Sequence, residues 1–420
     1  WKPLESVVNQ FKLRGSWGEL GNQNTSNLYP FYEILPVKSN SGNWLVNGGK
    51  TNTADIPSLV STLLTWERVR SFNVGFDFGA FSNRLTGSFD YFVRKTVDMV
   101  GPAPQLPLVL GIAPAIVNNA DMKSYGFEIE LSWRDRIGEV DYGVKFNLAD
   151  AQQKVVKYPN TTNAFSDWYA GKMSGEIWGY TSLGIAKTDE EMKEHLASLP
   201  NGGQNQLGNK WGAGDIMYAD INGDGKIDGG KGTLADPGDQ RIIGNSTPRY
   251  NFGLVLDASY KGFDVSIFFQ GVGKRDYAPI VGTNGAVFWG AVNNIWQSMA
   301  MEEHFDYFRP EGHPMGANLN GYYPRPDFTS NKNHQVQTRY LQDASYIRLK
   351  NLQIGYTLPK QWINKLHINR CRVYVSGDNL WTGTSLASMF DPETLAAGDW
   401  GSGKTYPLSK VISFGLNVNF

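Results

Sequence analysis

The stretch from Asp220 to Asp228 places oxygen-bearing side chains at the spacing of a calcium-binding loop. Asp220, Asn222 and Asp224 hold alternate positions, a glycine comes next, the backbone carbonyl of Lys226 follows, and Asp228 takes the ninth position. Ca²⁺ binds about six to eight oxygen atoms, and this spacing curls several of them around one point. The sequence therefore predicts a calcium ion as a structural cofactor.

The loop departs from a full EF-hand at its far end. Lys231 stands at the twelfth position, where an EF-hand carries a bidentate glutamate, and no long helical pattern flanks the loop. Asp236 or Asp239 would have to complete the shell of ligands, and we take Asp239 as the sixth member of the site. The alternative is an Asp-, Asn- and Gly-rich turn that binds no metal.

Aromatic side chains in the polar segments are a second group that could contact a ligand. Rings stack on the faces of sugars and also suit peptides, so these residues are candidates for substrate binding. The alternative is that the rings pack the loops against each other. The candidates are Trp168, Trp178, Trp289, Trp296, Tyr322 and Trp400.

Residues for enzymatic chemistry do not form a pattern of known spacing. The five histidines lack zinc-type spacing, the single cysteine excludes a disulfide framework, and no nucleophile or phosphate-binding motif is present. A net charge of −1 and a pI of about 6.6 argue against a nucleic-acid partner, which would need a basic face. We therefore expect neither a catalytic residue nor a nucleic-acid partner.

The elements that position these residues are strands, because alternation with a period of two runs along the whole chain. From Phe72 to Ala80 apolar residues alternate with polar residues or glycine, and the same pattern runs from Ile412 to Phe420. Such alternation places the apolar side chains on one face of a strand. The pattern predicts ten strands, near residues 9–20, 65–81, 84–94, 123–133, 139–151, 248–260, 263–271, 340–358, 371–382 and 408–420.

The predicted strands are long, and their connections fall into two alternating classes. Strands of about 9–11 residues cross a bilayer when tilted, whereas soluble strands average about 5–6 residues. Outer-membrane barrels alternate short periplasmic turns with long extracellular loops. We therefore predict an all-β fold, a transmembrane antiparallel β-barrel, with a soluble sandwich or propeller as the alternative. The short connections are 82–83, 134–138, 261–262 and 359–370, and the long ones are roughly 21–64, 94–122, 152–247, 272–339 and 383–405.

The even number of strands places both ends of the chain on the periplasmic side. Aromatic residues beside the short turns then form a girdle at that membrane interface. They are Trp133, Tyr260, Phe263 and Tyr356. On the neighbouring strands near 65–81 and 84–94, alternation directs one set of side chains to lipid and the other to the lumen. The lipid-facing set is Phe76, Phe78 and Phe89, and the lumen-facing set is Asp77, Ser88 and Asp90.

A series of short stretches, spread over nearly the whole chain, carries a family resemblance. They are LRGSWGELGN (13–22), LTWER (64–68), NVGFDF (73–78), NRLTGSFDYF (83–92), NNADMKSYGFE (118–128), IWGY (177–180), YADINGDGKID (218–228), GDQRIIGN (238–245), SYIRLKNL (345–352), SGDNLW (376–381) and FDPE (390–393). In this order they resemble the carboxyl-terminal barrel region of SusC/RagA-family TonB-dependent transporters from Bacteroidetes outer membranes. The calcium-type loop belongs to the pattern, with Asp239 at a position where such sequences usually carry an acid.

The resemblance implies an outer-membrane importer of oligosaccharides or peptides that works with a SusD-like surface lipoprotein and is driven by TonB–ExbB–ExbD. It also implies a plugged barrel of about twenty-two strands, and dimers of the importer–lipoprotein pair. The chain starts at Trp1 without a signal peptide. We therefore expect residues 1–420 to be a carboxyl-terminal part, with the plug and the remaining strands supplied by another segment or chain in outer-membrane lipid.

Two alternatives to energised import stay open at this point. One is a passive porin or a surface adhesin built on the same barrel, which would lack the plug. The other is a secreted carbohydrate-binding or hydrolytic β-protein, which would need no detergent for extraction. The sequence does not decide between glycan and peptide, because specificity lies in the geometry of the loops.

Overall fold

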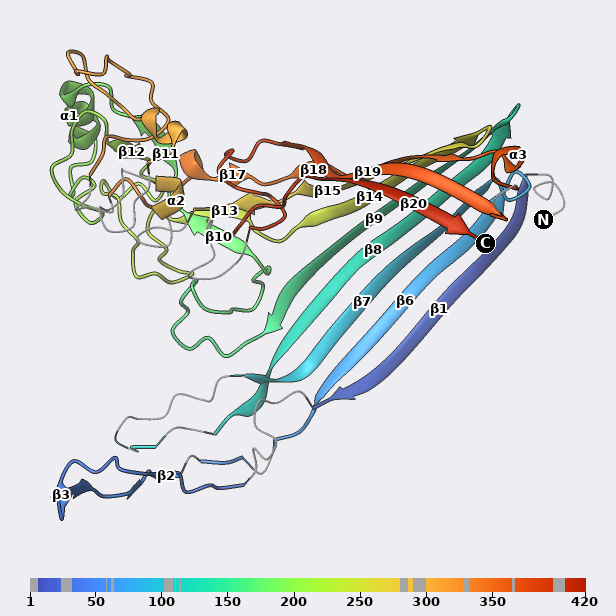
Figure 1. Cartoon of the computed structure of the whole chain (residues 1–420). Coiled ribbons are helices and arrows are strands. Elements are labelled where there is room, and N and C mark those ends of the chain that lie inside the picture. Colours follow the sequence, from blue (N-terminus) through green and yellow to red (C-terminus); the bar gives the residue numbers. More distant parts are fainter. Residues whose placement is uncertain are drawn as a thin grey trace.

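A computed structural model describes most of the chain, and ten long strands in it form one antiparallel sheet (Figure 1). The predicted all-β fold is confirmed. Because the ten strands lie in a single sheet, they do not form the two packed layers of a sandwich. The described residues are 7–23, 32–57, 59–61, 64–101, 109, 111–112, 115–279, 286–289, 300–327, 332–364, 367–395 and 405–420.

The strands of the sheet follow one another in chain order, each antiparallel to its neighbours. All ten predicted strands are present. Their bounds are β1 Val8–Asn22, β6 Glu67–Ala80, β7 Leu85–Gly101, β8 Val117–Ile137, β9 Val140–Lys157, β14 Arg249–Tyr260, β15 Phe263–Lys274, β18 Tyr346–Thr357, β19 Arg370–Thr384 and β20 Val411–Asn419.

The two classes of connection lie at opposite ends of the sheet (Figure 1). The short turns gather near the two ends of the chain, while the long connections and their small elements lie at the other end. At the β14–β15 turn, Lys261 and Gly262 have φ values of 47° and 90°. Two successive positive φ values match the right-handed twist of the flanking strands, as in a type I′ hairpin. The turn is therefore as tight as the spacing predicts.

Three predicted boundaries are wrong. The turn expected at residues 134–138 is only residues 138–139, because β8 continues to Ile137. The loop expected at 94–122 is much shorter, because β7 and β8 extend to Gly101 and back to Val117. Side-chain hydrogen bonds support this extension, and Asn118 Nδ2 donates to the Thr65 carbonyl at 2.8 Å. The strand expected from residue 340 begins at Tyr346, because residues 338–340 form a 3₁₀ turn beneath the loops.

The cross-strand register divides the sheet into an apolar face and a polar face. Phe76 pairs with Leu13 and Phe89, and the Phe76 and Phe89 rings stack with their centroids 5.6 Å apart. One residue further, Asp77 pairs with Lys12 and Ser88. Directly opposite residues share a face, and successive residues alternate. The predicted pairing and the separation of the two faces are therefore confirmed.

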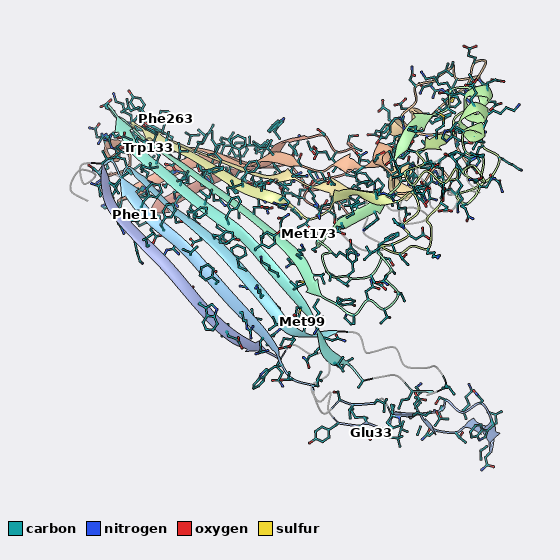
Figure 2. All side chains as sticks on the ribbon, turned by 180° about the vertical axis from the view of Figure 1, so that it is seen from behind. Phe11, Glu33, Met99, Trp133, Met173 and Phe263 are labelled. Carbon is teal, nitrogen blue, oxygen red and sulfur yellow. The ribbon has the colours of Figure 1, made fainter. Side chains whose placement is uncertain are left out.

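Two rows of aromatic residues mark the edges of the apolar face. Near the short turns, Tyr260 pairs with Phe263 and Phe263 pairs with Tyr356. Figure 2 shows Phe263 and Trp133 at this end of the sheet. Toward the long loops, a second row on the same face joins Trp17, Phe72, Val93 and Tyr125. These rows are twelve positions apart along β8, which gives a height of about 28 Å for strands tilted near ~45°, close to the ~25 Å of a membrane-facing band.

The long connections contain the smaller elements. No helix among the described residues is both long and apolar enough to cross a membrane. Small paired strands are β2 Val37–Lys38 with β5 Thr53–Ala54, β3 Leu45–Val46 with β4 Gly49–Lys50, β10 Glu176–Gly179 with β13 Arg241–Asn245, β11 Ser182–Ile185 with β12 Ile216–Tyr218, and β16 Asp276–Tyr277 with β17 Gln342–Asp343. These connections also contain the helices α1 Asp189–Ala197 and α2 Ala286–Trp289 and the 3₁₀ turns η5 Glu302–Phe305 and η6 Thr338–Tyr340, whereas helix α3 Lys360–Ile363 lies in the short β18–β19 connection.

Replacing Phe76 with Arg tests the orientation of the sheet. The charge would face lipid within the apolar band, so we expect Phe76→Arg to destabilise the assembled barrel by roughly 2–4 kcal/mol. Ser88→Arg is the matched control, because it adds the same charge on the neighbouring strand but on the polar face. Folded full-length protein in the outer membrane, quantified in a urea titration, gives the measurement. Equal effects of the two substitutions would contradict the assignment of the faces.

Candidate functional site

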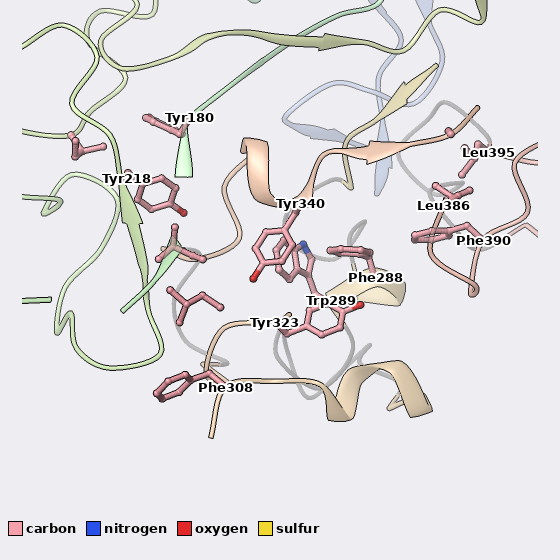
Figure 3. Close-up of a cluster of buried hydrophobic side chains, with 14 of the residues drawn as sticks. Tyr180, Tyr218, Phe288, Trp289, Phe308, Tyr323, Tyr340, Leu386, Phe390 and Leu395 are labelled. Carbon is pink, nitrogen blue, oxygen red and sulfur yellow. The ribbon is translucent and has the colours of Figure 1, made fainter. Parts of the chain in front are cut away.

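Three of the long connections fold against one another around a buried aromatic core (Figure 3). Trp289 is 1% exposed and meets the Tyr340 ring edge-on, with centroids 4.7 Å apart. The other labelled members come from three different connections, β9–β14, β15–β18 and β19–β20. A shared core of this kind makes the connections one packed platform rather than separate loops. These members are Tyr180, Tyr218, Phe288, Phe308, Tyr323, Leu386, Phe390 and Leu395.

A buried carboxylate joins two of these connections. Asp215 is 0% exposed and accepts hydrogen bonds from Arg325 at 2.6 Å, from Lys332 Nζ at 2.9 Å and from Asn333 Nδ2 at 2.9 Å. The backbone N–H of residue 212 donates to it as well, at 2.9 Å. A buried carboxylate is stable only when such partners replace water. Asp215 therefore fixes the β9–β14 connection against the β15–β18 connection.

The predicted calcium loop is closed by hydrogen bonds from its own side chains to its backbone. Asp220 accepts from the N–H of Gly223 at 2.6 Å and from the N–H of Gly225 at 2.8 Å. Both glycines have positive φ, 75° and 77°, which a residue with Cβ adopts only at a cost. Asp224 accepts from the N–H of Lys226 at 3.2 Å, and Asn222 accepts from the N–H of Asp224 at 3.1 Å. These turns place the oxygen-bearing side chains on one tight curve.

Asp239 lies at the base of this loop and braces its two sides. Its Oδ1 accepts from the N–H of Ile221 and its Oδ2 from the N–H of Asp228, each at 2.8 Å. Burial raises the pKa of Asp239, and the charge of Asp220 acts in the same direction. The Lys226 ammonium hydrogen-bonds to Asp228 and holds the pKa of that carboxyl below its usual range. The loop thus concentrates negative charge that one lysine partly neutralises.

The donor set of the loop fits Ca²⁺ in its chemistry. In the described part of the chain, no three His, Cys, Asp or Glu side chains are grouped as a metal site. A calcium loop, however, also uses amide and backbone carbonyl oxygens. Here Asn222 and the Lys226 carbonyl would add such oxygens to those of Asp220, Asp224 and Asp228. The calcium assignment stays a prediction.

The polar face of the sheet carries fixed ion pairs along the wall of the lumen. The Arg14 guanidinium on β1 binds two carboxylates at once, donating to Asp77 on β6 at 2.8 Å and to Asp90 on β7 at 2.7 Å. Such forked contacts hold the geometry of three strands. Further around the sheet, Arg372 on β19 binds Asp264 on β15 and donates to Gln353 on β18 at 2.9 Å. The inner wall is therefore charged but internally paired at these points.

A second ionic contact folds the β19–β20 connection onto the inner wall. Arg348 on β18 donates to Asp391 at 2.8 Å, and Lys350 donates to Glu393 at 2.8 Å. Arg275 adds hydrogen bonds to the carbonyls of Pro392 and Leu395, at 3.4 and 3.2 Å. The Arg348 guanidinium is 4% exposed and the Asp391 carboxylate 7%. This connection is therefore held against the barrel rather than free above it.

The paired sheet, the polar inner wall and the packed extracellular platform agree with one protein family. Residues 1–380 match the family model described as TonB dependent receptor-like, β-barrel. The chain belongs to this family. The family consists of receptors and transporters, and the protein lies in the outer membrane, as its relatives do.

Several relatives match almost the whole chain. TonB-dependent receptor P3 of Formosa agariphila is 28% identical over 445 residues, which cover 99% of this chain and 40% of that protein. TonB-dependent receptor SusC of Bacteroides thetaiotaomicron is 21% identical over 431 residues, covering 99% and 38%. The solved RagAB peptide transporter superposes with a TM-score of 0.71 at 22% identity, over 99% of this chain and 41% of that chain. The superposition shows the fold, and the barrel segment spans about two fifths of the length of these relatives.

The six aromatic residues predicted to bind substrate differ in how far their rings are buried or covered. Trp289 lies in the platform core, where His334, Tyr323 and Tyr340 contact its ring. Trp178 on β10 stacks on Phe165, with centroids 4.5 Å apart, so this face of its ring is covered. Their placement favours the alternative that rings pack the loops. Trp168 is 40% exposed, and Trp296 and Trp400 lie outside the described residues.

Tyr322 differs from the other candidates because it lines a groove. The groove has a volume of about 520 Å³ and is open to the outside of the platform. Gln342 donates to the Tyr322 hydroxyl at 2.6 Å, and burial raises the pKa of that hydroxyl. The remaining lining includes the charged residues Glu303, Asp306 and Arg339 beside apolar residues such as Leu341 and Met389. Tyr322 and Trp168 are thus the described candidates with surface left for a ligand.

The ionic contacts that organise the platform and the wall were not predicted from the sequence. Asp215 and Arg325 are 110 residues apart in the sequence, so no local spacing connects them. The Arg348–Asp391 and Lys350–Glu393 pairs had a weak signal, because two positively charged residues two apart on a strand meet two acids two apart in a loop. Their members lie in two of the stretches on which the family resemblance rests. Only the fold shows that these stretches bind each other.

Removing the Asp215 carboxylate tests how far the platform depends on it. We expect Asp215→Ala to destabilise the packed loops by about 3–5 kcal/mol, because Arg325 and Lys332 would lose their shared carboxylate. Limited proteolysis of intact cells that carry the full-length protein should then cut residues 158–248 much faster, while the barrel remains assembled. Glu190→Ala, which removes an exposed acid from the same connection, is the control. Unchanged proteolysis in the Asp215 variant would contradict this role.

Proposed function

We propose that this protein is part of a TonB-dependent importer that carries oligosaccharides or peptides across the outer membrane. One observation carries the proposal: a single sheet combines a lipid-facing apolar face, a polar inner wall and a large folded platform at its extracellular end. A polar wall of this extent suits solutes that move through water. The family match and the names of the relatives support the same function.

In this proposal the segment encloses the route of the substrate and binds the substrate, and it carries out no chemical reaction. Its inner wall supplies paired charges and polar side chains along the route of the substrate. Its platform presents the groove beside Tyr322 and the exposed Trp168, where sugar or peptide groups could be held against rings. We assign no catalytic residue.

The unpaired edges of the sheet indicate which partners the barrel needs. The outer edges of β1 and β20 pair with no other strand of the described sheet, and an open edge in lipid is very costly. Other strands must therefore close the barrel, and we propose that they come with a plug that TonB–ExbB–ExbD remodels. The folded platform is the surface that we assign to a SusD-like lipoprotein. Pairing of two importer–lipoprotein units is compatible with this arrangement.

Uptake in the presence and absence of TonB tests the importer. Cells that carry the full-length protein should accumulate labelled oligosaccharides or oligopeptides, and deletion of TonB should reduce accumulation to the level of a strain without the protein. Surface binding of the same ligand should persist, because capture needs no energy. Accumulation that survives the loss of TonB would instead establish a passive porin. Binding without any uptake would establish an adhesin.

We also propose that the loop from Asp220 to Asp228 binds Ca²⁺ as a structural ion. The ligands would be Asp220, Asn222, Asp224, the Lys226 carbonyl and Asp228, with Asp239 completing the shell from beneath. The ion would relieve the repulsion among these carboxylates and order the β9–β14 connection. Extracellular Ca²⁺ is plentiful, so a dissociation constant of ~10⁻⁴–10⁻³ M would suffice.

The calcium proposal predicts an effect of chelator that depends on Asp224. In the wild type, a chelator should accelerate proteolysis of residues 158–248, and millimolar-range Ca²⁺ should reverse the effect. In Asp224→Ala cleavage should be fast under both conditions, because one ligand is missing. Asp167→Ala removes an exposed acid from the same connection and should behave like the wild type. If chelator leaves the wild type unchanged, the loop is a turn without metal.

A further inference from the structure

Four positively charged residues form a row across neighbouring strands. Arg70 on β6 pairs with Lys95 on β7, Lys95 pairs with Lys123 on β8, and Lys123 pairs with Lys154 on β9. Glu19 on β1 continues the row beside Arg70. Because directly opposite residues share a face, all five side chains lie on the same side of the sheet. This row therefore brings three lysines together on adjacent strands, on the face that carries Phe72, Val93 and Tyr125.

This row faces outward, just above the membrane. It lies two positions beyond the row of Phe72, Val93 and Tyr125, on the side of the long loops. The Lys123 ammonium lies over the Tyr125 ring, 4.9 Å from its centroid, which places it on the aromatic, lipid-facing side. Two residues of a tilted strand raise the row by about 5 Å. That is the level at which the headgroups of outer-leaflet lipids begin.

The charge of the row is not balanced by the protein. Arg70 donates to Glu19 at 2.6 Å, but within the described residues Lys95, Lys123 and Lys154 make no ion pair. Adjacent strands are about 4.8 Å apart, and like charges directly opposite each other destabilise a sheet. The neighbouring acids have partners of their own, since Asp98 binds Arg68 and Asp150 binds Arg249. The three lysines are therefore left to interact with water or with an anion from outside the chain.

We propose that Lys95, Lys123 and Lys154 bind the phosphate groups of glycolipid headgroups in the outer leaflet. An ammonium group suits phosphate as a point charge, and three of them on adjacent strands match a headgroup better than a single ion. The apolar band directly below supplies the surface for the acyl chains, which a soluble anion would not use. The binding site depends on the position of the barrel in the membrane and not on what the protein transports.

Lipid binding by the full-length protein tests this site. The protein is purified in a non-ionic detergent, stripped of lipid and titrated with phosphorylated lipid A, with bound lipid counted by native mass spectrometry. Each lysine near an anionic headgroup contributes about a fivefold gain in affinity, so the Lys95→Gln/Lys123→Gln/Lys154→Gln variant should bind roughly a hundredfold more weakly. The Lys→Arg variant at the same positions keeps the charge and should bind as the wild type does.

The control variant is Lys12→Gln/Lys145→Gln/Lys360→Gln. It removes the same charge from the inner wall and from the end near the short turns, so its lipid binding should be unchanged. Three results would overturn the proposal. They are wild-type affinity in the Lys→Gln variant, equal binding of dephosphorylated lipid A, and full displacement of lipid A by inorganic phosphate at comparable concentration. The last result would identify a site for free anions instead of a lipid.

Discussion

A backbone amide inside a bilayer finds no water, so every N–H and C=O of a crossing segment must pair within the protein. This single constraint dictates the long antiparallel strands and their continuous pairing from β1 to β20. The register in turn decides which side chains meet lipid, because a slip of one residue would reverse both faces. Phe76 and Asp77 differ by one position and lie in environments of opposite polarity. The forked contact of Arg14 with Asp77 and Asp90 helps to hold that register from the inner side.

The same constraint explains what could be predicted from the sequence. Alternation is strong wherever one face meets lipid, so all ten strands were found in order. The predicted bounds were wrong where the pairing of β7 with β8 shifts its register beyond Thr96, because such shifts break the regular alternation before the strands reach Gly101 and Val117. The prediction that residues 340–345 belong to a strand of the sheet was wrong for the opposite reason. Tyr340 carries an apolar signal, but it is buried in the platform core and not on the sheet.

The platform was less predictable because it is built from distant contacts. The calcium-type loop is visible in the sequence, since its turns depend on residues two to five positions apart. The site around Asp215 is not visible in the sequence, because Arg325 and Lys332 come close to Asp215 only when two connections pack together. The aromatic residue type alone also did not distinguish a ring that packs the core from a ring that could bind a ligand, since Trp289 is buried and Trp168 is exposed. Spacing therefore identifies local turns, whereas burial decides whether a ring can meet a ligand.

The chain uses the same residue types in two different environments, a barrel wall that faces lipid and a platform that is surrounded by water. In the barrel, Phe414 is 85% exposed in the described sheet and belongs to a face that lipid covers. In the platform, Phe288 is 1% exposed and supports an ordinary water-excluding core. Ion pairs occur in both parts: Arg14 binds Asp77 and Asp90 on the inner face of the barrel, and the platform buries Asp215 against Lys332. The row that begins at Arg70 lies between the lipid-facing wall and the platform. Its lysines come two positions after the aromatic row of the lipid-facing side. Asp150, which lies nearer the short turns on the same face, is instead buried and paired with Arg249, so an unpaired charge on this face belongs at the height where lipid itself becomes polar.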